Sequence, residues 1–101
     1  MNIIYQQLIK LIKPEEYFLK CEKNFLQCLE KNQFRIDLTS SIEYISVSII
    51  LKHFVNQDYF EIDTKIHIVG MENNHIGSYR YIEDSEGNPV DDYLVGNFDT
   101  E

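Results

Sequence analysis

The sequence has few basic side chains and no segment that would divide the chain into domains. Only 9 Lys and Arg residues stand against 17 Asp and Glu residues among 101, so the formal net charge is −8. This deficit argues against direct binding to nucleic acid or to an anionic membrane, because both require a basic surface. No linker rich in Gly, Ser or Pro interrupts the chain, and 44% of it is hydrophobic. We therefore predict one folded domain spanning residues 1–101.

Targeting signals are also missing. No apolar run approaches membrane-spanning length, and the first residues lack the basic start and small-residue cleavage site of a signal peptide. We therefore expect a cytoplasmic protein. Cys21 and Cys28 lie on one expected helix with their Cα atoms about 10 Å apart, which is too far for a disulfide. We expect both to be small apolar residues on the buried side of that helix.

The motifs of metal, phosphate and nucleophile chemistry are absent as well. The three histidines lack ligand spacing, no G-x-S-x-G turn occurs, and the four glycines are isolated. Asp84-x-Glu86-x-Asn88 resembles the start of a calcium loop, but Pro89 and Val95 stand where that loop requires Gly and Glu. We therefore predict no catalytic residue, no metal site and no cofactor.

Helical spacing dominates the first half of the chain. Residues 3–12 place their apolar side chains on one face, and Pro14 suits the first turn of a second helix that continues to about residue 30. Residues 34–38 alternate as a short strand. Residues 40–56 are ambiguous: Ser40 to Glu43 form a capping box before apolar residues at helical spacing, whereas Ile45 to Ile49 alternate as in a strand. The cap and the segment length favour a helix, so residues 1–57 are predicted to be mainly helical.

Strand patterns dominate the second half. Residues 59–69 alternate strictly, residues 71–75 are polar, and residues 76–83 and 90–95 form two further strand patterns around the turn-forming residues 84–89. The last residues, 96–101, are predicted to be a loose acidic tail. The expected fold is α+β: N-terminal helices packed on one face of a small antiparallel sheet, with a C-terminal three-strand meander within residues 58–95.

Negative charge is concentrated in the second half. Residues 1–57 hold seven basic and six acidic side chains, a sum of +1, whereas residues 58–101 hold two basic and eleven acidic, or 2 − 11 = −9. Clustered like charges repel one another, and a mixture of basic and acidic residues would avoid this cost. The clustering therefore favours a functional acidic surface. If alternate apolar residues of strand 59–69 face the helices, the acidic ones between them face solvent. The predicted partner-binding residues are Glu61, Asp63, Tyr81, Glu83, Asp84, Glu86, Asp91, Asp92 and Tyr93, with the tyrosines as contact residues.

Two acidic stretches carry a resemblance to a known group of proteins: Tyr59–Ile66 (YFEIDTKI) and Tyr81–Val95 (YIEDSEGNPVDDYLV). They resemble the small acidic immunity proteins of bacterial polymorphic-toxin and contact-dependent growth inhibition systems. The resemblance implies a cytoplasmic antitoxin that binds one cognate toxin domain, often a nuclease, in a one-to-one complex and blocks its active site. The resemblance implies a role for the protein, but it identifies no individual binding residue. Independently of it, a carboxylate surface can occupy a nuclease groove in place of phosphates.

Two alternatives remain open. An acidic adaptor or nucleic-acid mimic would use the same surface to bind a DNA- or RNA-binding protein. A metal-dependent nuclease would use Asp63 and Lys65, since Asp63-Thr64-Lys65 has the D-x-K form in which a carboxylate holds the metal and Lys positions water. The acidic surface would repel a phosphate backbone, which argues against the nuclease.

Overall fold

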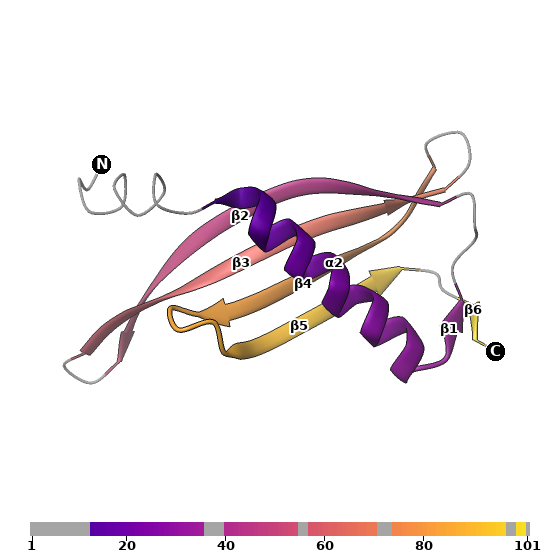
Figure 1. The fold of residues 1–101 in the computed structure, drawn as a ribbon. Helices are drawn as coiled ribbons and strands as arrows, with labels where there is room; N and C mark the ends of the chain where they lie inside the picture. Colours follow the sequence, from indigo (N-terminus) through magenta and orange to yellow (C-terminus); the bar gives the residue numbers. More distant parts are fainter. Residues whose placement is uncertain (1–12, 36–39, 55–56, 71–73, 97–98, 101) are drawn as a thin grey trace.

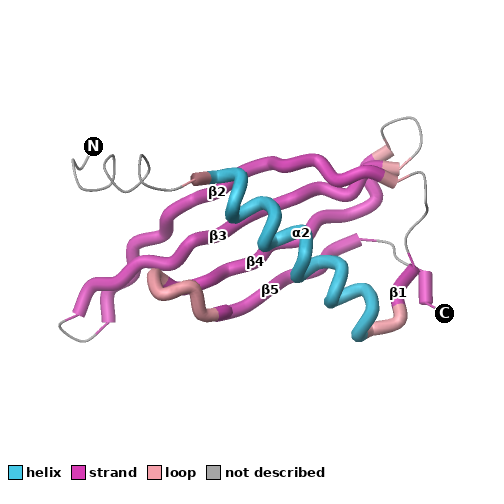
Figure 2. The backbone as a smooth tube through the Cα atoms, viewed as in Figure 1, coloured by secondary structure: helices cyan, strands magenta, loops and turns pink. Residues whose placement is uncertain are grey.

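In the computed structural model, one helix crosses one face of a four-stranded antiparallel sheet (Figures 1 and 2). The helix is α2 (Pro14–Lys31), and the sheet order β2-β3-β4-β5 follows the chain. The strands are β2 (Ser41–Phe54), β3 (Gln57–Val69), β4 (His75–Asp84) and β5 (Pro89–Gly96). The structure describes residues 13–35, 40–54, 57–70, 74–96 and 99–100. The predicted α+β class, with helix packed on an antiparallel meander, is confirmed.

The start of α2 follows its sequence signals. Pro14 occupies the first turn together with Glu15 and Glu16, whose charges complement the positive end of the helix dipole. Its buried face carries Cys21, Phe25 and Leu29. Burial raises the pKa of the Cys21 thiol to about 12, so this cysteine is the inert apolar residue that we expected. The predicted helix over residues 3–12 lies outside the described residues.

The predicted helix over residues 40–56 is wrong. Residues 41–54 form β2, which pairs with β3 from Ser41 opposite Val69 to Phe54 opposite Gln57. The register shifts between Tyr44 and Ser46, so Ile45 is an extra residue in the strand. The apolar positions looked helical because apolar residues lie on both faces of this strand, as the neighbours Ile49 and Ile50 show. The alternation of residues 45–49 was the valid signal.

The other strands agree with prediction to within about two residues. The strands predicted at residues 59–69, 76–83 and 90–95 are confirmed as β3, β4 and β5, with the turn between β4 and β5 where it was expected. β1 (Phe34–Arg35) confirms the start of the predicted strand 34–38, whose remaining residues lie outside the described ones. Asp99 and Thr100 were predicted to belong to a loose tail but form β6 (Asp99–Thr100), which pairs antiparallel with β1.

The core lies between α2 and the covered face of the sheet. Its buried residues are Cys21, Phe25, Leu29, Ile66, Ile68, Tyr79 and Tyr81. Phe18 and Tyr44 stack with ring centroids 4.5 Å apart, which fixes the helix against β2. Since Ile66 and Ile68 pack under α2, the predicted inward face of β3 is confirmed. Within the described ranges, no helix combines the length and apolarity needed to cross a membrane.

Candidate partner-binding surface

The sheet divides the predicted binding residues between its two faces. Glu61 and Asp63 of β3 share the open face with Asp91 and Tyr93 of β5, as their contacts with one another and with Arg80 show. The residues that alternate with these along β4 and β5 point toward the helix layer instead: Tyr81, Glu83 and Asp92. Asp84 and Glu86 belong to the β4–β5 turn. The nine residues therefore do not form one continuous face.

On the open face, the β3 carboxylates are compensated by cations. Arg80 donates to Asp63 from Nε, 3.3 Å from Oδ1, and from Nη2. Its guanidinium carbon also lies 5.5 Å from the centroid of the Tyr93 ring. The Nζ atom of Lys52 lies 3.8 Å from Glu61 Oε1. The solvent-facing carboxylate surface expected on β3 is therefore wrong: Glu61 and Asp63 are each only 9% exposed, and cations of β2 and β4 pair with them.

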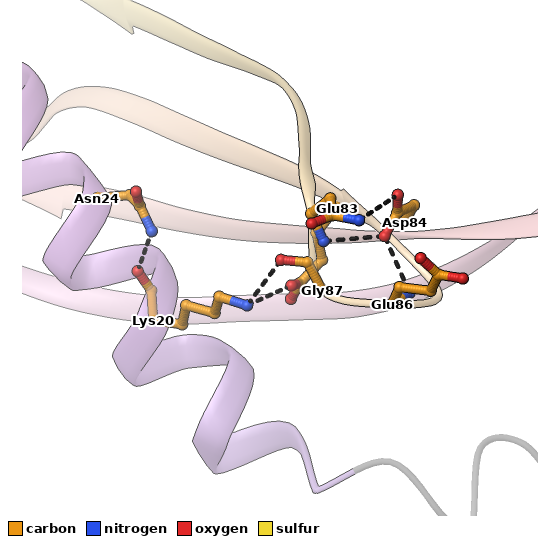
Figure 3. A network of polar contacts seen from close by, with 7 residues as sticks. Lys20, Asn24, Glu83, Asp84, Glu86 and Gly87 are labelled. Atoms are coloured by element: carbon orange, nitrogen blue, oxygen red, sulfur yellow. Dashed lines mark hydrogen bonds and ion pairs between the residues drawn. The ribbon is translucent and has the colours of Figure 1, made fainter.

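Glu83 is a buried carboxylate that connects the helix to the turn. It is 2% exposed, and its Oε2 accepts a hydrogen bond of 2.5 Å from Lys20 of α2 (Figure 3). Lys20 also donates to the backbone carbonyl of Gly87 at 3.3 Å. The hydrogen bond with Glu83 raises the pKa of Lys20. Tyr81 is likewise buried in the core, so Glu83 and Tyr81 stabilise the fold beneath the surface that a partner could reach.

The β4–β5 turn holds one carboxylate in place and exposes another. Asp84 accepts hydrogen bonds of 2.9 Å from the backbone N–H groups of Glu86 and Asn88 (Figure 3). The hydrogen bond from the Asn88 backbone is the main cause that lowers the pKa of Asp84. Gly87 completes the turn with φ +86°, a conformation that favours glycine. Glu86 is exposed.

The carboxylates of β5 are held by neutral donors. Asp92 accepts a hydrogen bond of 2.8 Å from the hydroxyl of Tyr79, and Asp91 accepts one of 2.8 Å from Tyr93. Burial, and then the hydrogen bond to Asp92, raises the pKa of Tyr79, so this hydroxyl remains a donor. Hydroxyl donors orient a carboxylate and leave its charge in place.

Four of the predicted residues therefore keep an uncompensated charge. Asp84, Glu86, Asp91 and Asp92, here called the β5 acidic edge, form no ion pair with any residue that the structure describes. The sequence explains why: residues 81–101 contain seven acidic and no basic side chains. The β5 acidic edge is thus a cluster of negative charge on one hairpin, with Asp91 on the open face of the sheet and Asp92 on the face toward α2.

A groove lies next to this edge, and the sequence analysis missed it. Its volume is about 470 Å³, and it is lined by the C-terminal half of α2, by β5, and by Tyr79 and Tyr81 of β4. The helix contributes the polar side chains of Asn24, Gln27 and Asn32, and β5 contributes Val90 and Asp92. These helix residues gave no motif in the sequence, because only the crossing of α2 over the sheet brings them to β5.

The histidine His67 and the D-x-K residue Asp63 contact other side chains of the protein. The His67 ring lies 4.6 Å from the His75 ring, edge to face, and burial is the main cause that lowers the pKa of His67. Asp63 of the D-x-K sequence is held by Arg80. Among the residues that the structure describes, no group of three or more His, Cys, Asp or Glu side chains could hold a metal ion.

Comparison with known proteins assigns no relative. No family model matches the chain, and no curated protein or solved structure matches it significantly. The fold, the β5 acidic edge and the adjoining groove are therefore the observations on which a function can be proposed.

Proposed function

We propose that this protein is an immunity protein that binds one basic toxin domain in the cytoplasm and covers its active site. The observation that carries the proposal is the β5 acidic edge, where four carboxylates without a cationic partner among the described residues lie on one hairpin. The resemblance of Tyr59–Ile66 and Tyr81–Val95 to acidic immunity proteins supports the same role. A nuclease is the favoured class of toxin, because its active site must present cations to phosphates.

The local chemistry suits capture of a cationic surface. Asp91 and Asp92 are already oriented by tyrosine hydroxyls and so lose little side-chain freedom on binding. Each can still accept charge-assisted hydrogen bonds from Lys or Arg of a partner. Tyr93 is 46% exposed beside them, which leaves part of its ring available as an apolar contact. Inhibition of this kind requires occupation of the toxin groove and no catalytic step.

The same charge favours rapid capture. Complementary fields raise association rate constants toward about 10⁸–10⁹ M⁻¹s⁻¹ at low salt. A protein that must intercept a toxin before damage accumulates benefits from this rate. Salt should slow the association, because the steering charges are exposed and therefore screened.

The test is charge reversal on β5, measured as binding to the product of the neighbouring gene. We expect Asp91→Lys/Asp92→Lys to reduce the association rate constant by about tenfold to a hundredfold at low salt. The matched control is Glu22→Lys/Glu43→Lys, which changes the net charge equally but acts near β2, where Glu22 contacts Tyr44. Stopped-flow fluorescence compares the two.

Equal slowing by both double variants would mean that only net charge matters and would remove β5 as the site. Failure of the wild-type protein to bind or inhibit the adjacent gene product would contradict the immunity role itself.

A further inference from the structure

β5 is an open edge of the sheet. It is the last strand in the order β2-β3-β4-β5, and all its residues are exposed except Leu94, which is half-buried. The side of β5 that faces away from β4 therefore presents backbone N–H and C=O groups that no strand described by the structure pairs. From Asp91 to Gly96 its pairing with β4 is regular. The opposite edge, β2, carries a bulge at Ile45 and the cation Lys52, both of which hinder strand addition.

The helix layer extends past this edge. The C-terminal half of α2 crosses over β5 and continues beyond it (Figure 1). The groove of about 470 Å³ lies between them and is lined by amide side chains of α2 and by Pro89 to Asp92 of β5. A strand placed beside β5 would lie about 4.8 Å away and would carry alternate side chains into this groove. The architecture thus leaves room under α2 for one more strand.

The negative charge of this edge favours a basic strand as its occupant. Lys31 is the only cation among the residues lining the groove, and Asp91 and Asp92 line it as well. In full overlap, a second copy of β5 pairing antiparallel would place Asp92 of each copy diagonally across from Asp91 of the other on the same face, and these like charges would repel each other. A strand that carries Lys or Arg would instead complement them.

We propose that an extended basic segment of the partner adds to β5 as a fifth, outermost strand, with its helix-facing side chains in the groove under α2. Backbone hydrogen bonds to β5 then supply affinity, and Asp91 and Asp92 supply selection for basic sequence. The identity of the occupant as a toxin segment rests on the proposed function, whereas strand addition to β5 can be tested without the toxin.

The probe is a synthetic peptide as long as β5, eight residues, in which lysine alternates with valine. Two further versions carry N-methyl groups on the odd or on the even residues, which keeps the charge but blocks hydrogen bonding along one side of the peptide. The full chain is labelled with ¹⁵N, and amide exchange and chemical shifts are recorded. We expect the parent peptide and one methylated version to bind, and the other methylated version to bind at least tenfold more weakly.

Amide exchange locates the binding site. The amides of β5 that point away from β4 should exchange at least tenfold more slowly with the parent peptide, and the β2 amides should not change. A peptide with glutamate in place of lysine should bind at least tenfold more weakly than the parent.

Three results would overturn strand addition. Equal binding of all three lysine peptides would mean that charge alone holds them; absence of binding would mean that the edge is closed. Protection of β5 in a concentrated sample of the chain alone, with dimers seen by sedimentation, would mean that a second copy occupies the edge. None of these results bears on the immunity role. Conversely, if the peptide adds to β5 but no toxin binds the protein, the proposed function is refuted. Strand addition to β5 still holds in that case.

Discussion

At the scale of single residues, the ion pair of Lys20 with Glu83 gives a specific prediction about stability. Glu83 is 2% exposed, and its second carboxylate oxygen, Oε1, has no hydrogen-bond partner among the described residues. Replacing Lys20 with Met would leave a buried carboxylate without its cation. We expect a loss of about 2 kcal/mol in the free energy of unfolding, below the usual value for buried pairs because the lysine side is partly solvated. Urea denaturation measures this loss.

Lys52→Met is the matched control for this variant. Lys52 also faces a carboxylate, but its Nζ lies 3.8 Å from Glu61 Oε1, and its side chain is 45% exposed. Such a pair contributes about 0–1 kcal/mol. Equal losses in the two variants would contradict the role assigned to the Lys20–Glu83 pair.

Among the structural elements, the β4–β5 turn depends on Gly87. Its φ of +86° is costly for residues with a Cβ atom, while a Cβ there would meet Lys20 Nζ at 3.6 Å and Glu83 Oε2 at 3.7 Å, which is ordinary contact. The backbone conformation alone should therefore make Gly87→Ala cost about 1 kcal/mol. Gly87→Asn should cost less, because asparagine tolerates positive φ. If Gly87→Asn has a lower melting temperature than Gly87→Ala, then the space available to the side chain limits this position.

β2 shows where the pattern of a single element misleads. Its apolar residues fit a helix because they lie on both faces of the strand, as the adjacent Ile49 and Ile50 do, and which face is buried depends on the packing of the sheet. β3 lacked this ambiguity: its regular alternation, with one face buried under α2, was predicted from the sequence. The sequence shows a strand reliably where one face is buried and the ladder is regular.

For the whole molecule, unbalanced charge should make stability depend on salt. With a net charge of −8 and an uncompensated β5 acidic edge, mutual repulsion opposes folding, and salt screens it. We expect the melting temperature to rise by roughly 5 °C between low and physiological salt, which corresponds to about 1 kcal/mol for a domain of this size. Differential scanning calorimetry measures the rise.

Asp91→Asn/Asp92→Asn should reduce this rise, since the double change removes two charges from the edge. The control is Glu22→Gln/Glu43→Gln, which has the same net charge. Its melting temperature should rise more with salt than that of the β5 variant. A melting temperature that falls with salt would mean that ion pairs such as Arg80–Asp63 outweigh the repulsion.

The candidate site was predictable only in part. Asp84, Glu86, Asp91 and Asp92 were identified from composition, because no basic residue follows Arg80 in the chain. Glu61, Asp63 and Glu83 look equally acidic in sequence, yet Lys52, Arg80 and Lys20 compensate them. Arg80 reaches Asp63 diagonally, since Asp63 stands opposite Ile82. Such a pairing depends on the register of two strands, which the sequence does not state.

The sequence by itself determined the α+β class, the start of α2, the β3–β5 meander and the excess of negative charge, because each follows from local periodicity or from a count of side chains. Only the tertiary structure decided that β2 is a strand, which carboxylates remain uncompensated, and that α2 overhangs β5 to form a groove. These features depend on contacts between residues far apart in the chain, and strand register and helix crossing set those contacts.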